Sequence, residues 1–486
     1  MNIQLTKEDK IFFILCLVLG IVAEQSFFHG RIGVSYLVFI ASFYSVFYWK
    51  YRKFSFFNKK MGLLLFMCIW ALSTGFLLYS NLILYVINSF IIPCLVIFHI
   101  IIITTKFPAS WHSFAFAEST LRKLAEGIKY SFAFLSLGPN RIKNGLNEEA
   151  RQIVKRIVIG LGISVPLLFV IIQLLISADG QFEQVLGSLP NWIAGLQLGD
   201  ELFRLAVIFS YTLGFFGLLQ VLSRRAQLPA TVKLDISIIW DSVIVLTVLV
   251  LLNLVYGLFT IVQFRYFFGE ALQSGYTYAQ YARRGFFELL IVTVFNLSIL
   301  TAALSFVKEQ NKGIKLFIKL LLTLLVLFSG VMLYSAVIRL LMYEESYGFT
   351  FLRVLAHSFM IFLMIILAYT LARVWLERLS LRHFYIISAL LYYSVINIVN
   401  IDQFVVDRNM NRYEQTGKID VSYLNSLSYE GVAGLADLYK QDKRVPMLGG
   451  ILRERKQEFE NSHENWQSYN FSRQRAFEKL ESLDLE

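Results

Sequence analysis

The sequence predicts an all-α membrane protein, a polytopic transmembrane helical bundle of about eleven spans with a small helical tail at its C-terminus. Hydrophobic residues make up 57% of the 486 positions and charged residues only 16%, whereas soluble domains carry about 25% charged residues. The charges gather in short stretches between long apolar runs. These runs are too long and too evenly apolar for the alternating strands of a barrel, so helices must satisfy the backbone hydrogen bonds in lipid.

About eleven apolar runs are long enough to cross the hydrocarbon core, and we expect each to form one helix. The spans are expected at roughly 11–28, 32–49, 61–79, 82–104, 157–178, 203–222, 237–262, 287–307, 317–342, 351–372 and 383–400. Only Ser80 and Asn81 separate the third span from the fourth. These two spans should therefore form a tight antiparallel hairpin.

Basic residues predict the orientation of the spans. If the N-terminus lies in the cytoplasm, most lysines and arginines before the tail fall on the cytoplasmic side, as the positive-inside rule requires. The acidic loop with Asp179, Glu183, Asp200 and Glu201 then faces outward. An odd number of spans places the C-terminus outside as well. We therefore expect a multi-pass protein with a cytoplasmic N-terminus and an extracytoplasmic C-terminal tail.

Composition divides the chain into four parts. Residues 1–104 hold the first transmembrane helices, and residues 105–156 form a cytoplasmic amphipathic linker. Residues 157–400 hold the remaining transmembrane helices, including the outer loop 263–288, and residues 401–486 form the soluble tail.

The cytoplasmic linker contains apolar residues at helical spacing. The apolar face consists of Phe114, Ala117, Leu121, Leu124, Ile128, Phe132 and Leu135, and the other face of Arg122, Lys123, Glu126 and Lys129. Such a helix suits the inner headgroup layer, with its apolar side in lipid and its cations near anionic headgroups. The alternative is a docking site for a cytoplasmic partner.

The tail carries signals for short helices. Asp420 and Ser428 are suitable N-cap residues, because their side chains can accept hydrogen bonds from the free N–H groups of a first helical turn. Helices are expected at 421–427, 429–440, about 447–460 and about 470–482. A hydrophobic core of this size would give only marginal stability by itself. We therefore expect the tail to pack on the outer loops.

Ionisable residues near the outer ends of the spans are the candidate functional residues, because such groups are costly close to a bilayer. The candidates for ligand binding are Arg265, Arg283, Arg284, Glu288, Arg339, Arg353 and His357. Arginine is suited to anions, because its planar guanidinium can donate two hydrogen bonds to one carboxylate or phosphate. The spacing of Arg284 to Glu288, and of Arg353 to His357, puts each pair on one helix face. The arginines either line an outer vestibule for an anionic headgroup, glycan or polymer, or form structural ion pairs with nearby acids.

Asp241 lies about one turn inside the cytoplasmic end of the seventh span. A proton or cation relay would need acids at several depths of the bilayer. Pairing with Arg224 or Arg225 is the simpler prediction.

The motifs of several enzyme classes are absent from the sequence. The six histidines show no H-E-x-x-H or similar ligand spacing, and neither a P-loop nor a G-x-S-x-G motif occurs. Cys16, Cys68 and Cys94 all fall inside apolar runs, which indicates neither a disulfide framework nor a thiolate metal site. We expect no catalytic residue, metal or cofactor, and the sequence gives no positive case for an enzyme.

One stretch of sequence combines aromatic residues and arginines in an order that hydropathy alone does not explain. Residues 276–289 read Tyr-Thr-Tyr-Ala-Gln-Tyr-Ala-Arg-Arg-Gly-Phe-Phe-Glu-Leu. This stretch resembles the signature Y-A-E-Y-A-R-R-G-F-F-E-L of an uncharacterised bacterial membrane-protein family, known only as a domain of unknown function. Gln280 stands where that family has an acid, which removes one partner for the arginines.

Two further segments resemble the same family. Residues 263–269 are similar to its Q-x-R-Y-L-F-G motif, and residues 407–424 to the element that follows its last helix. The likeness extends from roughly 200 to 440 and implies a bacterial inner (plasma) membrane protein. It implies no known reaction, substrate or catalytic residue.

Three hypotheses for the function follow. The first is a non-enzymatic scaffold, sensor or accessory subunit of a bacterial envelope system. The second is a transporter or flippase that binds an anionic substrate at an arginine-lined outer vestibule, although no inverted repeat is evident. The third is a glycan- or lipid-modifying enzyme with its active site at the outer face. The expected partners are membrane lipids together with another envelope membrane protein, an anionic lipid or a glycan, and no nucleic acid.

Overall fold

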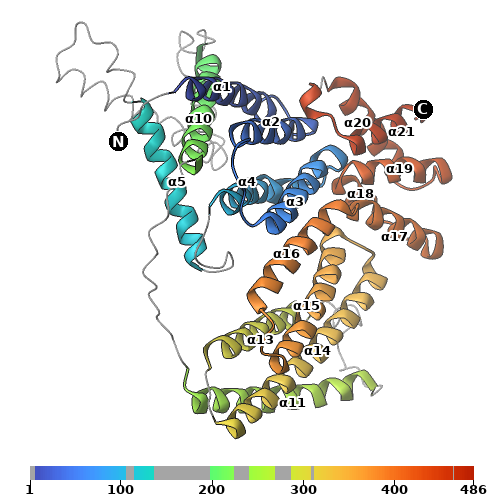
Figure 1. Cartoon of the computed structure of the whole chain (residues 1–486). Coiled ribbons are helices and arrows are strands. Elements are labelled where there is room, and N and C mark those ends of the chain that lie inside the picture. Colours follow the sequence, from blue (N-terminus) through green and yellow to red (C-terminus); the bar gives the residue numbers. More distant parts are fainter. Residues whose placement is uncertain are drawn as a thin grey trace. The chain divides into compact units, whose positions relative to one another are not determined.

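The computed structural model describes residues 6–105, 114–135, 198–223, 240–268, 286–307, 311–462 and 465–485. These residues form sixteen α-helices and no strand, which confirms the predicted all-α class (Figure 1). The helices before the tail are α1 (Lys7–Phe27), α2 (Val34–Lys50), α3 (Lys59–Leu78), α4 (Leu82–Thr104), α5 (Phe114–Leu135), α10 (Leu198–Ser223), α11 (Ser242–Phe268), α13 (Phe286–Phe306), α14 (Lys312–Tyr347), α15 (Phe351–Trp375) and α16 (Leu381–Ile398). The tail contains α17 (Ile401–Thr416), α18 (Val421–Leu427), α19 (Tyr429–Gln441), α20 (Leu448–Asn461), the short 3₁₀ helix η1 (Trp466–Ser468) and α21 (Phe471–Glu481).

Eight of the described helices are long and apolar enough to cross a membrane. A ninth span results if α16 and α17, which meet at a 58° bend, are counted together. The predicted number of about eleven is therefore not confirmed. Helix α2 has only 17 residues, or about 25 Å, and falls short of the hydrocarbon core of about 30 Å. The predicted span 157–178 lies outside the described residues.

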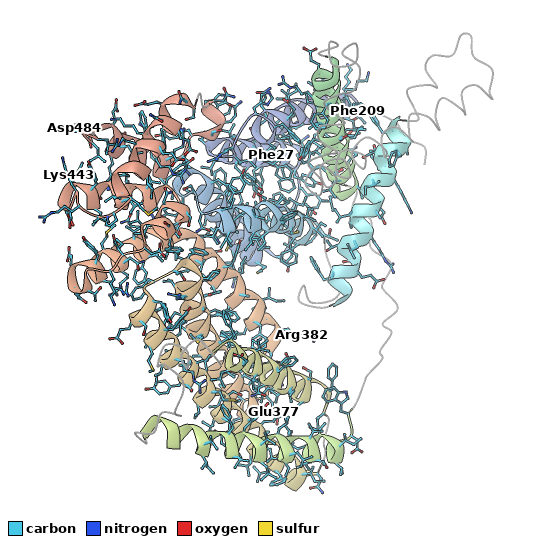
Figure 2. All side chains as sticks on the ribbon, turned by 180° about the vertical axis from the view of Figure 1, so that it is seen from behind. Phe27, Phe209, Glu377, Arg382, Lys443 and Asp484 are labelled. Carbon is cyan, nitrogen blue, oxygen red and sulfur yellow. The ribbon has the colours of Figure 1, made fainter. Side chains whose placement is uncertain are left out.

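The chain consists of two compact units, which we describe separately. The first unit contains residues 1–231 together with 462–474. In it α1 packs against α2 and α10, and α3 packs against α4. Aromatic side chains fill much of this core: the ring of Phe27 lies 4.8 Å from Phe39 and 5.5 Å from Tyr36 (Figure 2).

Helix α5 confirms the predicted amphipathic helix but not its predicted faces. Lys123 was expected on the polar face, yet it is buried, on the same side of the helix as Phe116 and Tyr130. This side packs against α10, where Ser131 Oγ donates to the carbonyl of Leu213 at 2.8 Å. The prediction was wrong because spacing alone does not distinguish a long side chain that packs along a neighbouring helix from one that faces water.

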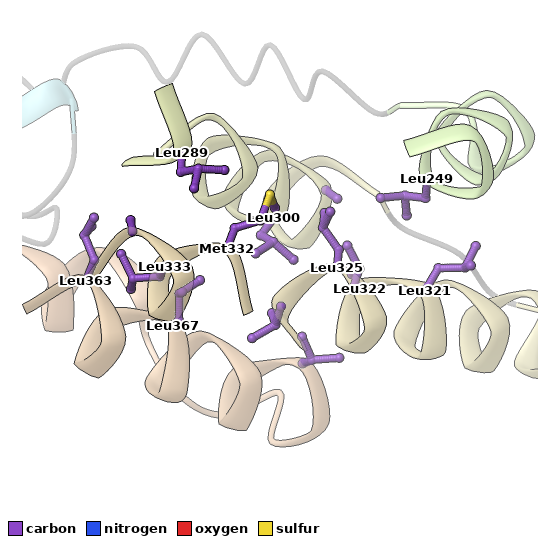
Figure 3. Packing of buried hydrophobic residues seen from close by; sticks show 14 of the residues in the cluster. Leu249, Leu289, Leu300, Leu321, Leu322, Leu325, Met332, Leu333, Leu363 and Leu367 are labelled. Carbon is purple, nitrogen blue, oxygen red and sulfur yellow. The ribbon is translucent and has the colours of Figure 1, made fainter. Parts of the chain in front are cut away.

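The second unit contains residues 232–461 and 475–486. Its membrane part is a bundle of α11, α13, α14 and α15, and all four helices contribute to one apolar cluster (Figure 3). A polar network crosses the bundle: Tyr256 OH donates to Asn296 Oδ1 at 2.7 Å, and Asn296 Nδ2 donates to Ser329 Oγ at 3.0 Å. Such hydrogen bonds fix the register of helices in lipid, where no water competes for them.

The four predicted tail helices are present, whereas α17 was not predicted. The side chains of Asp420 and Ser428 cap α18 and α19 as expected, accepting from the N–H groups of Tyr423 and Glu430. The expected helices near 447–460 and 470–482 are present as α20 and α21. Within the second unit the tail also has an apolar core, which includes the fully buried Leu435, Leu448 and Leu480.

Candidate functional site at the α14–α15 turn

Three of the predicted site residues lie on the two helices that meet at the α14–α15 turn, namely Arg339, Arg353 and His357. Gly348 ends α14 with a φ of +83° and donates its N–H to the Glu344 carbonyl at 2.7 Å. Thr350 then caps α15, with Oγ1 accepting from the N–H of Arg353 at 3.4 Å. A Cβ at position 348 would lie 2.7 Å from Asn409 Oδ1. Only glycine suits this position, both for its backbone conformation and for the space beside it.

A buried acid and a histidine meet beside this turn. Nδ1 of His357 lies 3.3 Å from Oε1 and 3.2 Å from Oε2 of Glu344, whose side chain is only 2% exposed. Nε2 of His357 is buried and has no hydrogen-bond partner among the described residues. The pair therefore joins α14 to α15 and leaves one ring nitrogen that can still donate or accept a hydrogen bond.

Of the two arginines near the turn, Arg353 is engaged by neighbouring groups of the protein and Arg339 is buried. The guanidinium of Arg353 donates to the carbonyl of Gly348 and lies 4.1 Å over the ring of Tyr343. Arg339 is 7% exposed and lies one helical turn before Tyr343 on α14. The carbonyl and the aromatic face thus hold the Arg353 guanidinium in place from within the protein.

Tail helices α17 and α18 cover the turn. Asn409 donates through Nδ2 to the Phe349 carbonyl at 2.8 Å and accepts from the Phe349 N–H at 3.1 Å. The Tyr423 hydroxyl accepts from the N–H of Phe351 at 2.8 Å, and burial raises the pKa of this phenol. Arg412 donates to the Ser346 carbonyl at 2.9 Å. Side chains of the tail thus satisfy the free backbone groups that the two helix ends leave at the turn.

The remaining predicted site residues are not placed at this turn. Glu288 is exposed in the first turn of α13. Arg265 lies on α11, with its side chain outside the described part, and Arg283 and Arg284 lie wholly outside it. The predicted spacing of Arg353 and His357 is confirmed, since both lie on α15. The covering residues Asn409 and Tyr423 were not predicted, because no periodic signal links a tail residue to a distant turn.

A second charged cluster lies at the ends of α14 and α15 that are far from their connecting turn, namely the start of α14 and the end of α15. Glu377, which follows α15 (Figure 2), accepts from Lys315 Nζ at 2.8 Å and from Lys319 Nζ at 2.9 Å. These hydrogen bonds, led by the one from Lys315, lower the pKa of the Glu377 carboxyl to about 2. Contacts between charged or ionisable side chains therefore join the two helices at both ends.

Asp241 has a local role at the start of α11. Its Oδ1 accepts from the N–H groups of Val243 and Ile244 at 2.8 and 3.1 Å, as in a helix N-cap. Its predicted partners Arg224 and Arg225 lie outside the described residues.

Two buried acids of the first unit also have partners that the sequence did not reveal. Asp9 Oδ1 accepts from Lys50 Nζ at 3.2 Å and from Gln220 Nε2 at 2.8 Å. Glu24 Oε1 lies 3.7 Å from Nε of Arg204 on α10. In the part of the chain that the structure describes, no group of three or more His, Cys, Asp or Glu residues is arranged to hold a metal ion.

The apolar helices, their charged ends and the polar network within the bundle define an integral membrane protein. Residues 66–438, more than three quarters of the chain, match the family model described as "Domain of unknown function (DUF4153)". The chain belongs to this family. No curated protein and no solved structure matches it.

Proposed function

We propose that the protein is a non-enzymatic scaffold of a bacterial envelope system, a sensor or accessory subunit of the plasma membrane that presents its tail on the outer face. Its partners are membrane lipids and a second envelope membrane protein. The observation that carries the proposal is that Arg353 is engaged within the chain and that side chains of the tail cover the α14–α15 turn.

The spacing of charges along α14 and α15 supports the membrane placement. Lys319 and Arg339 are about twenty residues apart on α14, as are Arg353 and Arg373 on α15. Twenty helical residues extend about 30 Å, which is the thickness of the hydrocarbon core. The two charged clusters can therefore lie in opposite headgroup layers. The positive-inside rule favours the lysine-rich end as the cytoplasmic one.

The tail contacts support an extracytoplasmic C-terminus. Helices α17 and α18 bind the arginine end of α14–α15, which is the end that the lysine cluster does not occupy. In the first unit, Gln467 and Tyr469 accept hydrogen bonds at the start of α2, close in sequence to the end of α1. Because Lys7 begins α1 at its other end, these contacts favour opposite sides for the two termini.

A second candidate function rests on His357. A buried ring nitrogen without a partner among the described residues, on the helix pair that also contains Arg339 and Arg353, is the kind of group that orients an anionic ligand. A transporter or flippase for an anionic lipid or glycan would use it as a contact to substrate.

Thermal unfolding in two kinds of nanodisc separates these functions. Wild type, Arg353→Ala and His357→Ala are compared in phosphatidylcholine and in phosphatidylglycerol nanodiscs, with Arg382→Ala as the control because Arg382 is exposed on α16. A scaffold predicts that both site variants unfold at a lower temperature by the same shift in both lipids. An anion-binding transporter predicts that phosphatidylglycerol stabilises the wild type and that the site variants lose this gain. That second result would contradict the proposed function.

A further inference from the structure

Residues 465–471 bind the start of α2. In the first unit, the N–H groups of Gly33 and Val34 donate to the carbonyls of Gln467 and Tyr469 at 3.0 and 3.1 Å. These are among the N–H groups that the first turn of α2 leaves without a helical partner. A Cβ on Gly33 would lie 2.4 Å from the Tyr469 carbonyl oxygen, so the close approach depends on glycine.

The same segment binds the end of α3, which is long and apolar enough to cross a membrane. Nδ2 of Asn470 donates to the carbonyls of Phe76 and Tyr79, each at 2.9 Å. Helix α3 ends at Leu78, so these are carbonyls of its last turn and of its C-cap. The hydrogen bonds at both helices fix the depth of the segment at the level where α2 begins and α3 ends.

In this segment the aromatic side chains are exposed and the polar side chains are buried, the reverse of a surface that faces water. Trp466, Tyr469 and Phe471 are 55%, 42% and 47% exposed, and the rings of Tyr469 and Phe471 lie 5.5 Å apart. The polar side chains between and after them are buried, namely those of Gln467, Ser468, Asn470 and Ser472. Polar groups therefore face the helices, and aromatic groups face outward.

We infer that Trp466, Tyr469 and Phe471 form an aromatic anchor that inserts into the boundary between lipid headgroups and acyl chains. The lipid surface is the occupant because the anchor lies at the C-terminal end of α3, a helix long and apolar enough to cross a membrane, and that boundary begins at such an end. Tryptophan and tyrosine are enriched at this boundary, since their rings are apolar and their N–H and O–H groups are polar. The inference depends on α3 crossing the membrane and holds for either leaflet, so it does not rest on the proposed scaffold function.

Electron paramagnetic resonance of spin-labelled protein in phosphatidylcholine nanodiscs tests the anchor. Cys16, Cys68 and Cys94 are replaced by alanine, and a nitroxide is attached to Trp466→Cys, Phe471→Cys or Glu454→Cys. Glu454 is an exposed charged residue of α20 and is the control. Because Trp466 and Phe471 are already exposed, these substitutions remove little buried contact.

The collision rates of each label with oxygen and with a water-soluble nickel chelate give the result. Oxygen concentrates in lipid and the chelate in water. We expect oxygen collisions to exceed nickel collisions at 466 and 471, and the reverse at 454. Higher nickel collisions at 466 and 471 would place the segment in water and overturn the inference. Low rates with both reagents would also overturn it, because they would mean that protein, from a second copy or another partner, covers the segment.

A second measurement uses native tryptophan fluorescence and therefore does not depend on the folding of the cysteine variants. Phospholipids brominated near the headgroup quench the fluorescence of nearby tryptophans. Of the seven tryptophans, Trp466 should contribute to this quenching, so the quenched fraction should fall in Trp466→Phe. An unchanged quenched fraction would contradict the anchor.

Discussion

Nδ1 of His357 lies 3.2 Å from Oε2 of Glu344, and this contact joins α15 to α14 beside their connecting turn. The glutamate side chain is only 2% exposed, so it depends on the histidine for a hydrogen bond that water cannot supply. His357→Ala should lower the free energy of unfolding by about 1–3 kcal/mol, the cost of leaving a buried polar group unpaired. Denaturant unfolding in detergent, with Arg382→Ala as the control, measures this loss. A His357→Ala variant as stable as the control would show that the contact is unimportant for stability.

Gly348 should tolerate no side chain. Its φ of +83° disfavours any L-residue, and a Cβ would lie 2.7 Å from Asn409 Oδ1. We expect Gly348→Ala to destabilise the protein by more than about 1 kcal/mol. Gly417→Ala is the comparison, because Gly417 also has a positive φ, +66° in the left-handed helical region, but no atom within 4 Å of the added Cβ. Equal losses for the two variants would mean that the backbone conformation, and not the contact with Asn409, sets the cost.

Asn409 should be the main polar link between α17 and the α14–α15 turn. It is buried and makes two hydrogen bonds to the backbone of Phe349, whereas Asn411, two residues later, is exposed. Asn409→Ala should reduce stability by about 1–3 kcal/mol, and Asn411→Ala by less than about 0.5 kcal/mol. Limited proteolysis of the tail provides a second readout, with faster cleavage expected only for Asn409→Ala. Similar cleavage of both variants would argue against this link.

The Lys315–Glu377–Lys319 cluster should make stability depend on acidic pH. The pKa of Glu377 is lowered to about 2 from an ordinary value near 4.5, so the folded state binds its proton more weakly than the unfolded state. The stabilisation is therefore complete above about pH 4.5 and is lost as the pH falls from there toward 2. Glu377→Gln should be less stable than wild type at pH 7, and the difference should shrink across this window. A difference that stays constant from pH 7 to pH 3 would refute the assignment.

Hydropathy and local capping chemistry predicted much of the fold. Eight of the predicted spans coincide with helices long and apolar enough to cross a membrane, because burial in lipid requires a continuous apolar run. The caps at Asp420 and Ser428 were predictable since a cap needs only the few residues around it. The position of Arg353 and His357 four residues apart on one helix followed from the sequence in the same way.

Contacts between distant residues could not be predicted in this manner. Asn470 binds the Phe76 carbonyl across 394 residues of sequence. Gln220 reaches Asp9 across 211. Neither pair leaves a periodic pattern in one sequence. The covering of the α14–α15 turn by Asn409 and the burial of Lys123 belong to the same class, since both depend on which helices pack together.

In the proposed orientation, the two charged clusters of α14 and α15 lie on opposite sides of the membrane, with the arginine end outside. Labelling of single cysteines in intact cells tests it most directly. Lys312→Cys and Glu345→Cys are placed on exposed positions near the two ends of α14, after Cys16, Cys68 and Cys94 are replaced by alanine. We predict that a membrane-impermeant maleimide labels the cysteine at 345 in intact cells and the cysteine at 312 only after permeabilisation. Labelling of both positions in intact cells, or of position 312 alone, would contradict the account.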